Sequence, residues 1–152
     1  MTPARSRPES QAFGRFARRL AEPGTDPIRL SVGDLDARRD FIDVRDVARA
    51  LVALAVEGKA GRLYHVGTGR SHAVRDGLDH LIQRSGRAVT VEIALVPGAR
   101  RGPGDSRAAI GRIVAETGWR PAIGWRQSLE DLWDEARARR ERLPLTAPPR
   151  IV

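Results

Sequence analysis

Short strand patterns alternate with amphipathic helix patterns along this chain, and the alternation is the strongest constraint on its fold. Residues 28–33 and 88–96 read as strands, whereas residues 44–56 and 74–84 carry apolar residues at helical spacing. Strands and helices that follow one another in this order favour a sheet covered by helices. The sequence therefore predicts an α/β fold, and its 152 residues fit one domain of ordinary size.

Further segments complete the predicted order. A helix over residues 9–21 should bury one apolar face, made of Phe13, Phe16, Ala17 and Leu20. A short strand over residues 63–66 would hold His65 in the core, a helix over residues 108–117 would end at Gly118, and residues 126–142 would form the last helix. We expect residues 1–10 to be ragged and the Pro-rich residues 143–152 to be disordered.

The chain is strongly basic, with a formal net charge of +8, and Lys59 is the one basic residue besides histidine that is not arginine. Such a bias fits contact with phosphate, on a nucleic acid or a nucleotide, and it equally fits a GC-rich coding background. Because the arginines are spread along the chain without interleaved aromatic residues, we expect no nucleic-acid partner.

Several other classes of protein are disfavoured by what the sequence lacks. It has no cysteine and no histidine pair at metal-binding spacing, so no disulfide and no metal site are expected. No apolar run approaches the length of a membrane span, and the basic N-terminus has no apolar core of the kind a secretory signal needs. We therefore expect a cytoplasmic protein without a membrane partner.

Two arginine-bearing segments are candidates for a phosphate site. In RRDF, Arg39 could clamp a diphosphate with its planar guanidinium, or it could be a surface arginine paired with Asp40 or Asp43. In VPGARRGPGD, Arg100 and Arg101 lie in a loop that Gly and Pro make compact, which could hold a phosphate or simply be solvated.

Two other polar motifs have structural interpretations. Asp43 stands at the N-cap of the helix predicted over residues 44–56, and Asp46 follows three residues later, as in a capping box with aspartate in place of glutamate. GTGRSH, residues 67–72, lacks the G-x-G-x-x-G spacing of a dinucleotide loop, so we expect a tight turn there.

Taken in order, three stretches of the sequence resemble a known family. They are GDLDARRDF, DFIDVRDVARA and TGWRPAIGWRQSLEDLWDEAR. Together they resemble the C-terminal part of the extended short-chain dehydrogenase/reductases, and more narrowly the NAD-dependent epimerase/dehydratase family that acts on nucleotide sugars. The first is similar to GDP-mannose 4,6-dehydratases and GDP-6-deoxy-mannose reductases, and the second is nearer the reductases. The resemblance implies an incomplete Rossmann fold: a substrate-binding lobe with the last Rossmann elements, over residues 11–142.

The resemblance also implies roles for individual residues. Arg39 would clamp the diphosphate of a nucleotide-diphosphate sugar, with a GDP-sugar favoured over UDP or dTDP, and Arg101 would be the second clamp, with Arg100 as its alternate. The family pattern at the second clamp is closer to Arg-Pro-x-Asp. Here Gly102 intervenes before the proline, and Asp105 would take the acidic place. Asp46 would cap and orient the helix behind the site.

The family's cofactor loop and catalytic pair have no counterpart in this sequence. Members carry a G-x-x-G-x-x-G loop for NAD or NADP and a Tyr-x-x-x-Lys pair. Here the single tyrosine, Tyr64, has Thr68 at the lysine position, and the single lysine, Lys59, precedes it. We therefore expect no catalytic and no cofactor-binding residue in this chain.

Two interpretations of the whole chain follow. We expect the chain to be the substrate-binding portion of a nucleotide-sugar dehydratase, reductase or epimerase. It would be inactive alone, and its partner would be an upstream cofactor-binding domain or subunit. The alternative is a stand-alone nucleotide-sugar-binding module or a split-enzyme subunit.

Overall fold

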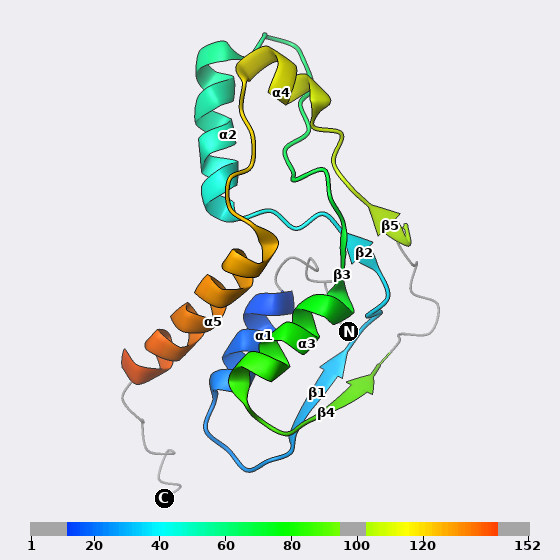
Figure 1. Cartoon of the computed structure of the whole chain (residues 1–152), viewed down its shortest axis with the longest axis vertical. Coiled ribbons are helices and arrows are strands. Elements are labelled where there is room, and N and C mark those ends of the chain that lie inside the picture. The colour runs from blue at the N-terminus through cyan, green and yellow to red at the C-terminus, as the bar shows by residue number, and fades with distance from the viewer. Residues whose placement is uncertain (1–11, 95–102, 143–152) are drawn as a thin grey trace, which may run out of the picture.

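The computed structural model describes residues 12–94 and 103–142. Helices and strands alternate along these residues, which confirms the α/β class (Figure 1). The expectations for residues 1–10 and 143–152 concern segments outside the described residues. The elements are α1 (Ala12–Ala21), β1 (Ile28–Val32), β2 (Arg38–Arg39), α2 (Val44–Glu57), β3 (His72–Ala73), α3 (Val74–Ser85), β4 (Val89–Ile93), β5 (Asp105–Ser106), α4 (Gly111–Thr117) and α5 (Trp125–Arg142).

The larger core lies in a lower lobe formed by α1, β1, α3, β4 and α5 (Figure 1). β1 and β4 pair in parallel, from Ile28 opposite Val89 to Val32 opposite Ile93. Side chains of β1 are alternately buried and exposed, as expected for a strand with one face covered. The three helices pack on one another, and the predicted face of α1, Phe13, Phe16, Ala17 and Leu20, is buried as expected.

A glycine allows α1 to approach α3 closely. A Cβ added at Gly77 of α3 would lie 2.7 Å from Phe13 Cζ and 2.9 Å from Trp125 Cζ2. Side chains larger than hydrogen therefore do not fit at this position without movement of the aromatic rings.

A second, smaller core lies in an upper lobe, formed by α2, residues 58–70 and α4 (Figure 1). Among the described residues, its cluster of buried side chains consists of Ala50, Ile113 and Trp119. The Asp43 carboxylate accepts a hydrogen bond from the Arg45 backbone N–H at 2.9 Å, so Asp43 is the N-cap of α2 as predicted. α4 ends at Gly118, as predicted, whose φ of 67° suits glycine, but it begins three residues later than expected.

Two predictions for the upper lobe are wrong. Residues 63–66 do not form a strand, because no other described segment pairs with them in a ladder of backbone hydrogen bonds. His65 is exposed and is not a core histidine.

A small sheet connects the two lobes, with the strand order β3–β2–β5. β2 pairs antiparallel with β3 and parallel with β5, so Arg39 has His72 on one side and Ser106 on the other. None of the helices within residues 12–94 and 103–142 is long and apolar enough to cross a membrane.

Candidate functional site

Arg39 lies on the central strand of the small sheet, next to the second arginine-bearing segment of the sequence. Its Nη1 donates hydrogen bonds to the Pro103 carbonyl at 2.7 Å and to the Arg38 carbonyl at 2.8 Å. Pro103 leads into β5, which pairs with β2. The fold therefore brings RRDF and the end of the ARRGPGD loop into contact, although they are far apart in the sequence.

The other two predicted clamp residues, Arg100 and Arg101, lie outside the described residues. The structure does bear on the alternative interpretation of Arg39 as a surface arginine paired with a neighbouring aspartate. Asp40 accepts hydrogen bonds from other groups, and Asp43 forms an ion pair with Arg45 at 2.8 Å. Both carboxylates named in that alternative thus bind elsewhere.

Asp40 fixes the backbone that carries the site. Its half-buried carboxylate accepts hydrogen bonds from the Thr68 N–H and the Gly69 N–H, both at 2.8 Å, and from the Ala108 N–H at 3.0 Å. The Thr68 hydroxyl donates a further hydrogen bond at 2.6 Å. One carboxylate therefore joins the strand of Arg39, the turn predicted over residues 67–72 and the approach to α4.

Glycines make that turn. Gly69 has a φ of 73°, which an L side chain rarely adopts. A Cβ at Gly67 would lie 2.7 Å from Asp40 Oδ2, so a larger residue would push the carboxylate away from its donors. The chain bends at Gly67 and Gly69, as predicted for GTGRSH, but the last residue of the motif, His72, begins β3.

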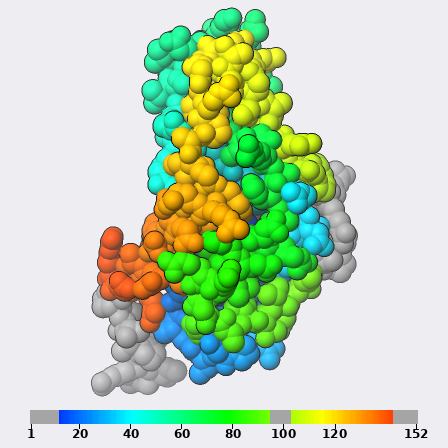
Figure 2. Space-filling view, viewed as in Figure 1, coloured from blue at the N-terminus to red at the C-terminus, as the bar shows by residue number. Residues whose placement is uncertain are grey.

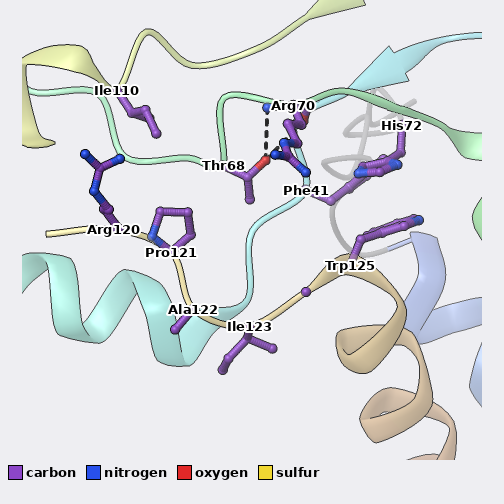
Figure 3. Close-up of a pocket in the computed structure, with 11 residues that line it drawn as sticks. Phe41, Thr68, Arg70, His72, Ile110, Arg120, Pro121, Ala122, Ile123 and Trp125 are labelled. Atoms are coloured by element: carbon purple, nitrogen blue, oxygen red, sulfur yellow. Dashed lines mark hydrogen bonds between the residues drawn. The ribbon is translucent and has the colours of Figure 1, made fainter.

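A half-open cavity of about 430 Å³ adjoins the strand of Arg39 (Figure 3). Its aromatic wall is formed by the Trp125 ring, which stacks with His72 at a centroid distance of 5.0 Å and with Phe41 at a centroid distance of 4.7 Å. Arg70 and Arg120 also line the cavity and bring positive charge to it. Such a wall suits the face of a planar or apolar group, and the arginines suit an anion.

Asp46 is fully buried and ties α2 to the segment before α5. It accepts hydrogen bonds from the Ala122 N–H at 3.0 Å and the Ile123 N–H at 2.9 Å, and it forms an ion pair with Arg49. Burial opposes its ionisation, but the Arg49 guanidinium and the two amides outweigh burial and lower its pKa. The predicted capping box is thus corrected: Asp43 caps α2, and the Asp46 carboxylate holds residues 122–123 in place of the N-cap amide.

Several residues of this region were not singled out by the sequence. Arg70 and His72 follow one turn, which Asp40 holds, whereas Arg120 and Trp125 flank the segment that Asp46 holds, so the four side chains meet only through these long-range hydrogen bonds. The two Gly-containing turns, GTGRSH and GWRPAIGW, were the available signals. They show where the backbone bends and not which side chains converge.

The family comparison agrees with the resemblance seen in the sequence. Residues 3–67 match the model of the NAD dependent epimerase/dehydratase family. The chain is 37% identical over 141 residues to the GDP-6-deoxy-D-mannose reductase of Pseudomonas aeruginosa, covering 88% of this chain and 45% of that protein. It is 31% identical over 131 residues to the dTDP-6-deoxy-L-talose 4-dehydrogenase (NAD(P)(+)) of Kitasatospora kifunensis, covering 83% of this chain and 41% of that protein.

A solved structure matches this chain over a similar share of both chains. The chain aligns with RMD from Pseudomonas aeruginosa complexed with NADPH at 32% identity and a TM-score of 0.72, covering 88% of this chain and 44% of that one. The fold is therefore part of an extended short-chain dehydrogenase fold. The chain spans less than half the length of the curated relatives it matches.

Proposed function

Because the chain belongs to the NAD-dependent epimerase/dehydratase family, we propose that it is the substrate-binding portion of a nucleotide-sugar oxidoreductase, extending over residues 11–142. The observation that carries the proposal is the contact between Arg39 and Pro103. It sets the guanidinium of one predicted clamp against the end of the loop that carries the other, Arg101 or its alternate Arg100. Two arginines from adjacent segments suit the two phosphates of a nucleotide-diphosphate sugar.

The relatives' names narrow the substrate class. Both curated relatives are named for a 6-deoxyhexose on a nucleoside diphosphate, one with GDP and one with dTDP. We propose a GDP-linked 6-deoxyhexose, because the higher identity is to the GDP-sugar reductase. For the same reason a reductase is favoured over a dehydratase or an epimerase.

The chemistry of hydride transfer would come from NAD or NADP held by a second, cofactor-binding lobe. The solved relative RMD is complexed with NADPH, and the present chain covers less than half of it. What this chain would contribute is substrate position. Arg39 neutralises and orients the diphosphate, while Asp40 keeps the strand of Arg39 and the residue 67–69 turn in register.

Ligand-induced stabilisation tests the substrate-binding role. We expect GDP-mannose at about 100 times its Kd to stabilise the chain by about 2.7 kcal/mol, seen as a rise in Tm. The Arg39→Ala variant should bind about tenfold or more weakly, because a charge-assisted hydrogen bond is lost. Arg38→Ala is the matched control, since the neighbouring side chain points to the opposite face of β2 and donates to the Ser71 carbonyl.

Two results would contradict the proposal. One is a chain that melts cooperatively yet shows no change in Tm with GDP-, UDP- or dTDP-sugars. The other is an Arg39→Ala variant that binds as tightly as the unmodified chain. Turnover of a GDP-sugar with NADPH by the chain alone would instead show that no separate cofactor-binding lobe is needed.

A further inference from the structure

The aromatic-walled cavity of about 430 Å³ has no part in the proposed function, and it lies where the two lobes meet. Its volume is in the range of small-molecule sites. On its walls, Ile110 packs on the small cluster of the upper lobe, whereas Phe41 and Trp125 pack on the cluster of the lower lobe. Figure 2 shows the surfaces of residues 68–72 (green) and 120–125 (orange) side by side. A molecule bound here would therefore contact both lobes.

The described residues that line this cavity give it a positive charge. Arg70 and Arg120 line it, and none of those lining residues is acidic. Figure 3 shows Arg70 beside Thr68 and Arg120 beside Pro121. Both arginines form hydrogen bonds through backbone atoms, but in the part of the chain that the structure describes neither guanidinium has an acceptor or a carboxylate partner. Two guanidinium groups are thus available to an anion.

The carboxylates that hold the walls are occupied by backbone amides. Asp40 accepts from the amides of residues 68 and 69, next to Arg70, and Asp46 accepts from the amides of residues 122 and 123, close to Arg120. These hydrogen bonds fix the two segments that carry the arginines. The cavity is therefore formed before any ligand arrives, which lowers the entropic cost of binding.

Aromatic side chains give the cavity a surface for a planar group. Phe41, His72 and Trp125 all line it, and all three are partly exposed. The plane of the Trp125 ring is inclined by 13° to that of His72 and by 20° to that of Phe41. Nucleobases stack on aromatic rings of this kind, and stacking depends little on which base it is.

We propose that this cavity is a second ligand site, for a nucleoside phosphate whose base contacts the aromatic wall and whose phosphate is bound by Arg70 and Arg120. The site is separate from the diphosphate site of Arg39. Arg39 is not among the described residues that line the cavity, and its Nη1 donates to the Pro103 carbonyl at 2.7 Å. The inference does not depend on the proposed function.

A small inorganic anion fits the cavity less well than a nucleoside phosphate. It would satisfy the guanidinium groups of Arg70 and Arg120, but it would leave the aromatic wall in water. A ligand with both a planar ring and a phosphate uses both parts of the lining, and buried ligand surface is what small-molecule sites provide.

Calorimetric titration of the full chain with AMP tests the site. AMP is the probe because neither curated relative is named for an adenosine nucleotide, so it is not the nucleotide of the proposed substrate. We expect one AMP to bind per chain. Adenosine and inorganic phosphate should each bind at least about tenfold more weakly than AMP, because each uses only one part of the lining.

Arginine variants test which side chains bind the phosphate. Arg70→Ala and Arg120→Ala should each weaken AMP binding about tenfold, because a charge-assisted hydrogen bond is lost. Both residues are exposed, so both variants should fold. Arg126→Ala is the matched control and should leave AMP binding unchanged, since it removes the same charge from an exposed residue beside Trp125 that is not among those lining the cavity.

The three tryptophans report where AMP binds. In a nitrogen–proton NMR spectrum, AMP should move the indole signal of Trp125, which lines the cavity. It should move those of Trp119 and Trp133 less, because both are only 5% exposed and neither is among the residues that line this cavity. A purely structural role of the arginines would not produce this difference.

Four results would overturn the proposal. They are no binding of AMP, equal AMP affinity of Arg70→Ala, Arg120→Ala and Arg126→Ala, inorganic phosphate that binds as tightly as AMP, and an indole signal of Trp125 that does not move. A fifth is loss of AMP binding in Arg39→Ala, which would place the nucleotide at the diphosphate site. Binding of AMP without binding of GDP-mannose counts against the proposed function alone, and the reverse result counts against the second site alone.

Discussion

Removal of the Asp46 carboxylate should release residues 122–123 from α2. In Asp46→Ala two charge-assisted hydrogen bonds, to the Ala122 and Ile123 amides, are lost together with the ion pair to Arg49. Each such hydrogen bond is worth about 1.5 kcal/mol, whereas the half-exposed Arg49 pair adds less than about 1 kcal/mol. We expect a loss of about 3 kcal/mol in the free energy of unfolding, a large part of the stability of a small domain.

Urea unfolding followed by tryptophan fluorescence measures this loss directly, because Trp119 and Trp125 lie on either side of the segment that Asp46 holds. With an m-value of about 2 kcal/mol/M, the midpoint should fall by about 1.5 M. Asp131→Ala is the control, since Asp131 is an exposed partner of Arg45 and should cost at most about 1 kcal/mol. Equal losses in the two variants would refute the assignment of Asp46 as the link between α2 and α5.

Two further predictions concern packing and pH. Gly77→Ala should destabilise the chain by about 1–3 kcal/mol, because the new methyl group would clash with Phe13. Gly14→Ala in α1 should stabilise the chain by about 0.5–1 kcal/mol, because its methyl group meets nothing within 4 Å and alanine favours a helix. Thermal melts of the two variants check that the changes in stability have opposite signs. The side-chain hydrogen bond from Arg45 lowers the pKa of Asp43, and Arg49 and two amides outweigh burial to lower that of Asp46. A carboxyl whose pKa is lowered in the folded state adds stability above its unfolded pKa of about 4. The urea midpoint should therefore be lower at about pH 3 than at about pH 6, and this decrease should be smaller in Asp46→Asn. An equal decrease in Asp46→Asn and the unmodified chain would contradict the role given to Asp46.

Much of the lower lobe could be predicted from local patterns. Phe13, Phe16 and Leu20 repeat at helical spacing and are buried, and the alternation of Ile28, Leu30 and Val32 matches the covered face of β1. The apolar faces of α1 and β1 are buried by other elements of the lower lobe, all of them within the described residues. Local periodicity and tertiary packing therefore agree.

The upper lobe was harder to predict, because its patterns call for neighbours that no described segment supplies. Leu51 and Val52 belong to the apolar pattern that predicted α2, yet both are exposed. Residues 63–66 read as a strand, but a strand exists only with a partner ladder.

The candidate site depended on long-range contacts. The sequence pointed to Arg39 through its motif, and the structure places it beside Pro103. The role of Asp40 could not be foreseen, because its donors at Thr68, Gly69 and Ala108 lie in distant turns.

The unequal sizes of the two hydrophobic clusters govern how long the chain would survive in a cell. Within the described residues, the cluster between α2 and α4 has three buried side chains, far fewer than the cluster of the lower lobe. A unit with so little core opens at small cost, and proteases cleave in proportion to the open population. Any molecule that binds only the closed unit lowers the open population and slows this cleavage.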